Sequence, residues 1–136
     1  MLSSFYMSIK VKSTAVAIAT VSTVLSYSVP SQAGEYKYLY ELDKLAKQQD
    51  VKSYIDKLSA SDKLKQGKRY CTILEQGSMK DVYSVHQNIA QYSLQEGYSD
   101  QIIGGEIAIF YASIKELCPE YIYKFNNFMG SEEKEI

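Results

Sequence analysis

The chain has 136 residues, of which 46% are hydrophobic and 23% charged, and its formal net charge is −1. This length predicts one domain, because two separate cores would each bury too little surface, and the hydrophobic fraction excludes disorder throughout. The absence of a strongly basic segment disfavours a nucleic-acid-binding protein, and one histidine with two cysteines is too few soft ligands for a closed zinc site.

Residues 1–33 have the features of a secretory signal peptide. Two lysines and no acid precede an uncharged run at residues 14–29, and Ser31 and Ala33 stand at positions −3 and −1 of a cut before Gly34. A membrane anchor is the alternative, but a spanning helix needs about 20 predominantly apolar residues, and this run is shorter and diluted by Thr and Ser. We therefore expect a secreted or periplasmic protein with no stable membrane span after cleavage.

The rest of the chain has apolar residues at helical spacing, which predicts an all-α bundle of four or five helices with one disulfide. Residues 34–50 form a tyrosine-rich segment that is predicted to be helical or, at its start, extended, because three of its tyrosines alternate with other residues. A disulfide-stapled helical domain is expected over residues 51–129. Residues 130–136 are expected to be a charged, flexible tail.

Small polar residues and glycines mark the predicted helix ends in the first half of this domain. A short helix is expected over residues 51–58. The next should begin after an N-cap at Ser61 and run to about Gln76. Gly77 then suits the left-handed conformation that often follows a helix C-terminus.

Three further helices are expected after this turn. Ser78 is the predicted N-cap of the first, with acidic Asp81 in its opening turn, and Gly97 is its predicted end. A longer apolar helix follows and stops before Pro119, which cannot continue it comfortably. The last helix is predicted over residues 120–128.

The two cysteines, Cys71 and Cys118, each share a helical face with apolar residues. Both sulfurs should therefore face the core, and an oxidising compartment would join them in a disulfide. A redox-active pair is the alternative, but catalytic dithiols usually stand as Cys-x-x-Cys near a helix start. Closing a loop of about 48 residues would stabilise the domain by roughly 4 kcal/mol in the chain-entropy treatment. Gly67, one turn before Cys71, would let a neighbouring element approach closely.

Two segments carry a resemblance to a known family. The sequence G-K-R-Y-C-T-I-L-E-Q-G-S at residues 67–78, followed by A-S-I-K-E-L-C-P-E-Y at residues 112–121, resembles the domain of unknown function 732 family. The likeness covers residues 54–121, about half of the chain. These are small exported bacterial domains with a G-x-x-x-C helix and a closing helix that ends in Cys-Pro. The resemblance implies a compact helical fold with one disulfide, and it implies no reaction.

Little in the sequence points to catalysis. His86, the one imidazole, is a candidate general base or metal ligand, but no acid lies one helical turn away, so a partly exposed position beside the apolar stripe of its helix is favoured. Gly104 and Gly105 lie within a helical pattern and indicate close helix packing or a kink, not a phosphate-binding loop. No catalytic, metal-binding or cofactor-binding residue is assigned, and no cofactor is expected.

Tyrosine is frequent, with 13 residues and no tryptophan. Its ring and hydroxyl suit both protein interfaces and the boundary of a small core. Helices between residues 51 and 117 have enough periodic apolar residues to close a core alone. The tyrosines outside them are therefore the candidate partner-binding residues: Tyr36, Tyr38, Tyr40, Tyr121 and Tyr123.

The sequence thus predicts an exported, non-enzymatic helical module that binds an unidentified protein or associates with the cell envelope. The alternative is a carrier of a small ligand or lipid in a cavity between helices. A hydrolase is disfavoured, because the sequence offers no set of nucleophile, base and orienting group. A contiguous exposed patch of tyrosine and isoleucine would favour protein binding, whereas a closed apolar cavity of several hundred Å³ would favour the carrier.

The exported protein should begin at Gly34, because the small residues before it fit a signal-peptidase site. The intact mass of the secreted species measures this start, whether translation begins at Met1 or at Met7. A mass that retains residues 1–33 would instead indicate an anchored protein.

Overall fold

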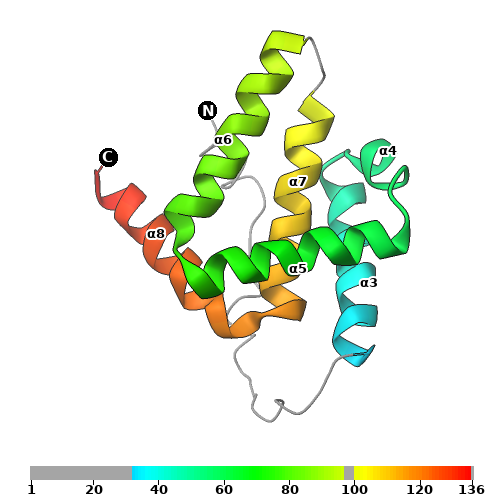
Figure 1. Ribbon diagram of the computed structural model, residues 1–136, viewed down its shortest axis with the longest axis horizontal. Coiled ribbons are helices and arrows are strands. Elements are labelled where there is room, and N and C mark those ends of the chain that lie inside the picture. Colours follow the sequence, from blue (N-terminus) through cyan, green and yellow to red (C-terminus); the bar gives the residue numbers. More distant parts are fainter. Residues whose placement is uncertain (1–31, 97–99, 136) are drawn as a thin grey trace.

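The computed structural model describes residues 32–96 and 100–135, and this part of the chain is helical and contains no strand (Figure 1). The α-helices are α3 (Gln32–Gln48), α4 (Lys52–Ile55), α5 (Ala60–Gln76), α6 (Met79–Glu96), α7 (Asp100–Ala112) and α8 (Ile122–Glu135). A π-helical turn, Ser113–Leu117, and a 3₁₀ turn, Pro119–Tyr121, lie between α7 and α8. The predicted all-α class is confirmed, and α4 is only four residues long.

Helix α7 lies at the centre of the bundle. Helices α3, α4, α5 and α6 all pack against it. Figure 1 shows α5 crossing α7, with α6 on one side of α7 and α3 on the other. Residues 103–112 of α7 are buried except Glu106, which is partly exposed. A helix that is apolar on nearly all sides has no stable solvent face, so its neighbours must surround it.

Helix α3 supplies one wall of this core. Tyr38, Leu42 and Ala46 follow one another at a spacing of four residues and have no exposed surface. This spacing places them on one face of the helix, which packs against α7 and the π-helical turn. The expectation that the helices between residues 51 and 117 close the core alone is therefore wrong.

The close approach predicted at Gly67 is made by a side chain of α3. A Cβ at this position would lie 2.8 Å from the ring and hydroxyl of Tyr38 and 2.9 Å from Leu117. The Tyr38 hydroxyl passes this glycine and donates a hydrogen bond to the backbone carbonyl of Lys63 (2.5 Å). Gly67 thus leaves the space that lets a large aromatic residue of α3 lie against α5.

The helix ends follow local capping chemistry, with two differences from the predictions. The N-cap of α5 is Ser59 and not Ser61, because the Ser59 hydroxyl accepts a hydrogen bond from the backbone N–H of Asp62 (3.1 Å). Gly77 ends α5 with a φ of −146°, so the predicted left-handed conformation is wrong. A Cβ on Gly77 would instead collide with the Asp81 carboxylate.

The cap predicted at Ser78 is confirmed. Its hydroxyl accepts from the backbone N–H of Lys80 (3.2 Å), and the Asp81 carboxylate accepts from the backbone N–H of Ser78 (2.8 Å). This reciprocal pair satisfies orphan donors at the start of α6. At the preceding helix end, the Lys124 ammonium of α8 donates to the carbonyls of Leu74 (2.5 Å) and Gly77 (2.9 Å). A cation at this position also stabilises the negative end of the helix dipole.

The predicted disulfide joins Cys71 of α5 to Cys118, and their Cα atoms lie 5.9 Å apart. Cys118 directly follows the π-helical turn Ser113–Leu117, and its backbone N–H donates to the carbonyl of Ser113 (2.9 Å). One hydrogen bond thus spans five residues, one more than in an α-helix. The disulfide fastens the segment just after the π-helical turn to the middle of α5. The position of both cysteines on apolar helix faces predicts this pairing.

Several predicted boundaries differ from the structure or fall outside it. Residues 1–31, which include most of the predicted signal peptide, lie outside the described residues, as does the predicted helix end at Gly97. Helix α8 does not end at residue 128, and it continues through Gly130 to Glu135, so the backbone of the segment expected to be a flexible tail is helical almost to its end. Within the described ranges, no helix is both long and apolar enough to cross a membrane.

A chain that starts at Asp50 should lose its cooperative thermal unfolding. Removing α3 would take three fully buried side chains from the core, and the loss of one large core side chain typically lowers the free energy of unfolding by about 2–5 kcal/mol. Small domains have only about 5–15 kcal/mol in total. Circular dichroism against temperature measures the transition, with a chain that starts at Gly34 as the control. A sharp melt of the shorter chain near the temperature of the control would contradict the role assigned to α3.

Candidate functional site

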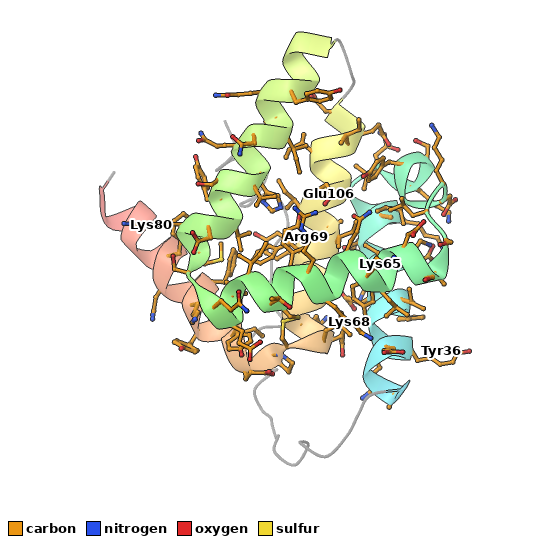
Figure 2. All side chains as sticks on the ribbon, in the orientation of Figure 1. Tyr36, Lys65, Lys68, Arg69, Lys80 and Glu106 are labelled. Atoms are coloured by element: carbon orange, nitrogen blue, oxygen red, sulfur yellow. A yellow bond between two sulfur atoms is a disulfide. The ribbon has the colours of Figure 1, made fainter. Side chains whose placement is uncertain are left out.

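The Glu106 carboxylate is the centre of a hydrogen-bonded cluster between helices. The hydroxyl of Tyr54, on α4, donates to Oε2 (2.8 Å), and the hydroxyl of Tyr70, on α5, donates to Oε1 (2.9 Å). Figure 2 shows Glu106 on α7, beside the point where α5 crosses. Three separate helices therefore meet at one partly exposed carboxylate.

Two glycines of α7 allow Tyr54 to reach this carboxylate. A Cβ on Gly105 would collide with the Tyr54 ring, and a Cβ on Gly104 would lie 2.9 Å from Val51. The glycine pair thus lets α4 pack directly on the backbone of α7. This is the close helix packing that the sequence predicts for Gly104 and Gly105, and it brings the Tyr54 hydroxyl within hydrogen-bonding distance of Glu106.

His86 of α6 extends the cluster into the core. It is 0% exposed, so the predicted partly exposed position beside the apolar stripe is wrong. Its Nε2 lies 2.9 Å from the Tyr70 hydroxyl, and its ring contacts Tyr70 and Phe110 with centroids 5.3 and 5.8 Å away. The Tyr70 hydroxyl donates its one proton to Glu106, so its oxygen acts as an acceptor toward His86. The Nε2 atom of His86 therefore carries the imidazole proton.

The surroundings keep this imidazole neutral. Burial lowers the pKa of His86 to about 3, far below the ordinary value of about 6.5. Burial is also the main reason that the pKa of Tyr54 is raised, with the negative charge of Glu106 as the second cause. The tyrosine hydroxyl thus remains protonated as a donor, and the histidine remains an uncharged link. The cluster has the chemistry of a fixed hydrogen-bond relay from the core to Glu106.

A groove opens beside the cluster, between α4, α6 and α7. It has a volume of about 470 Å³, and its walls are mainly apolar. Its lining residues are Tyr54, Asn88, Ile89, Tyr92, Ile102 and Glu106. Tyr54 and Glu106 belong to both the groove and the cluster, so the hydrogen bonds that order the cluster also orient two side chains of the groove wall. Volumes of this size are typical of small-molecule sites.

The structure separates the five tyrosines that the sequence grouped as candidate partner-binding residues. On α3, Tyr36 and Tyr40 are 80% and 73% exposed, whereas Tyr38 is fully buried, so its assignment to an accessible surface is wrong. Near and on α8, Tyr121 is half-buried beneath the Lys124 ammonium, and Tyr123 is exposed. Helices α3 and α8 lie on opposite sides of α7 (Figure 1). The exposed tyrosines therefore do not form one contiguous patch, and their role in binding a partner stays a prediction.

Sequence reasoning missed the cluster itself. Tyr54, Tyr70 and Glu106 are 16 to 52 positions apart and belong to no motif, since tertiary packing alone brings them together. One signal was present: Glu106 is the single charged residue between Ile102 and Ala112, in the most apolar segment of the folded domain. An acid in such a segment needs hydrogen-bond donors nearby. No group of three or more potential metal-ligating side chains occurs among the described residues.

Neutral His86 should make the folded state less stable in acid. Below pH about 6.5 the unfolded chain binds a proton at this imidazole, and the folded chain does so only near pH 3, so stability falls as the pH decreases through this window. The slope from this residue approaches about 1.4 kcal/mol per pH unit. Urea unfolding at several pH values measures it.

The variant His86→Gln is the control for this experiment, because its amide can donate to the Tyr70 hydroxyl but does not titrate. Its unfolding free energy should depend less on pH than that of the wild type, since the carboxylates contribute equally to both profiles. Parallel profiles for the two proteins would mean that His86 is not held neutral in the fold.

Comparisons with known proteins found no relative of this chain. No family model, curated protein or solved structure matches it. The resemblance to the domain of unknown function 732 family therefore remains a prediction from the cysteine segments.

Proposed function

We propose that this protein is an exported, non-enzymatic binding module that holds a small ligand in the groove between α4, α6 and α7. The observation that carries the proposal is the groove itself, with about 470 Å³ of space, mainly apolar walls and one oriented carboxylate. Ligand sites typically combine an apolar lining with a few fixed polar groups, and this groove has both. The groove is open to solvent at one side, where exposed Tyr92 and Asn88 line it, so a ligand can enter without a change of fold.

The distribution of tyrosines is the reason to prefer this function over docking to a protein. A contiguous exposed patch of tyrosine and isoleucine was expected to favour protein binding, and Tyr36, Tyr40 and Tyr123 lie on separate helices. The tyrosine and isoleucine side chains that do gather line the groove, which is open to solvent and is not the closed cavity expected of a carrier, so a bound ligand would stay partly exposed. Tyr36 and Tyr40 nevertheless share one face of α3 at a spacing of four residues and are largely exposed. That pair favours protein binding as a second candidate function, located away from the groove.

The position of His86 supports a binding role over a catalytic one. Its imidazole is fully buried and hydrogen-bonded to Tyr70, so it does not reach the groove, where a substrate would lie. A general base must approach the proton that it removes within about 3.2 Å or through one water. The relay is better suited to orienting Glu106 than to transferring a proton to a bound molecule.

Export is supported by the signal-like residues 1–33 and by the Cys71–Cys118 disulfide. Disulfides persist in oxidising compartments and are rare where thiols are kept reduced. The resemblance of the cysteine segments to an exported bacterial family agrees with this location. We therefore place the proposed ligand site outside the cytoplasm.

The neutral fluorescent probe N-phenyl-1-naphthylamine should bind the purified exported protein saturably and at a one-to-one ratio. Ile102 is half-buried on the groove wall and is absent from the main core cluster, so Ile102→Ser should weaken binding without unfolding the domain. The loss of apolar contact predicts an affinity about tenfold lower. Probe fluorescence measures the dissociation constant of each protein.

The double variant Tyr36→Ser/Tyr40→Ser is the matched control, because it removes exposed apolar surface on α3 and leaves the groove unchanged. It should bind the probe like the wild type. Loss of binding in this variant, with Ile102→Ser unaffected, would move the site to α3 and support the second candidate. No saturable binding by the wild type would contradict the groove as a ligand site.

A further inference from the structure

Of the described residues that line the groove, one is charged. Among its lining residues, Glu106 is charged, and the others are tyrosine, isoleucine and asparagine. Within the described residues, no lysine or arginine forms an ion pair with Glu106. Arg69, which precedes Tyr70 on α5, is exposed, and its guanidinium forms no ion pair with Glu106. The groove therefore presents a carboxylate that has no ion-pair partner among the described residues.

The carboxylate retains the capacity to bind a further donor. An ionised carboxylate offers about four lone-pair sites, and the hydroxyls of Tyr54 and Tyr70 each occupy one. Both tyrosines lie on the α4 and α5 sides, and they fix the orientation of the carboxylate within the groove wall. The remaining lone pairs are available to a donor that enters the groove, and a charged donor forms the stronger hydrogen bond.

The other walls suit a cation that also has an apolar part. The rings of Tyr54 and Tyr92 line the groove with Glu106, and aromatic rings attract an ammonium group through their faces. Ile89 and Ile102 supply an apolar surface on the facing helices α6 and α7. The groove is thus lined by a carboxylate, aromatic rings and aliphatic side chains.

We propose that the groove binds an amphiphilic organic cation, with its ammonium group against Glu106 and its apolar part along Ile89 and Ile102. This inference rests on the proposed function and adds the chemical class of the ligand. An anionic amphiphile of the same shape would be repelled by the carboxylate. A neutral alcohol could donate a hydrogen bond to the carboxylate but would not offset its charge, so it would bind more weakly than the ammonium.

Three probes with the same alkyl chain separate charge from apolar contact. Octylammonium, octanol and octanoate would each be titrated into the purified exported protein at pH about 7, where the amine is protonated. Amide chemical shifts of α6 and α7 report the dissociation constant and the location of each probe. Octylammonium should bind at least about tenfold more tightly than octanol, and octanoate should bind most weakly. Added salt should reduce the advantage of octylammonium.

The variant Glu106→Gln tests the same point from the protein side. Its amide keeps the size of the side chain and can still accept from one tyrosine, but it removes the charge. Octylammonium should then bind about as weakly as octanol, and the affinity for octanol should change little. The wild-type comparison of the three probes remains decisive even if this variant is too unstable to titrate.

The outcomes separate this inference from the proposed function. If no probe shifts the groove residues of the wild type, both the ligand site and the ligand class are wrong. If octanol or octanoate binds the groove as tightly as octylammonium, the ligand site stands and the preference for a cation is overturned. Octylammonium binding that survives Glu106→Gln unchanged would also overturn it.

Discussion

The need to bury α7 explains how the other helices are arranged. Its residues 103–112 are apolar apart from Glu106, and no side of the helix is suited to face water. One neighbouring helix covers only part of such a cylinder, so α3, α4, α5 and α6 each pack against a different part of it. Each Å² of apolar area removed from water stabilises the folded state by roughly 25 cal/mol. Four other helices bury such area against α7.

Glu106 links the buried helix α7 to the proposed binding site. A carboxylate in an apolar helix is unfavourable unless donors surround it, and the hydroxyls of Tyr54 and Tyr70 meet this need. His86 in turn donates to Tyr70, so a line of hydrogen bonds links α6, α5, α7 and α4. The same carboxylate lines the groove. A structural requirement of the core therefore also holds a charged group in a fixed orientation at the surface.

A disulfide, a lysine ammonium group and two glycines keep the surrounding helices in place. The Cys71–Cys118 disulfide fastens α5 to the end of α7, and the Lys124 ammonium fastens the end of α5 to α8. Gly67 and Gly105 act by their lack of a side chain, since each accommodates the ring of a tyrosine from another helix. These contacts hold the four surrounding helices, three of them longer than α7, against one apolar helix within a domain of about 100 residues.

The features that depend on near neighbours in the chain could be predicted from the sequence. Apolar periodicity identified the helices, Ser78 and Asp81 marked a helix start, and the apolar faces of Cys71 and Cys118 indicated their pairing. Each of these is a pattern within a few turns of one helix, where side-chain direction follows from the backbone period. The close packing at Gly105 was visible for the same reason, although its partner was not.

Contacts between side chains on different helices could not be predicted from the sequence. Tyr38 is buried and Tyr36 and Tyr40 are exposed, because the helix places the first on the side opposite the other two, and α5 and the π-helical turn cover that side. His86, Tyr70, Glu106 and Tyr54 lie on four helices, and no spacing in the chain encodes their contacts. Helix packing depends on the combined shape of all side chains at an interface, whereas sequence periodicity reports one helix at a time. The cluster and its groove are therefore properties of the assembled bundle.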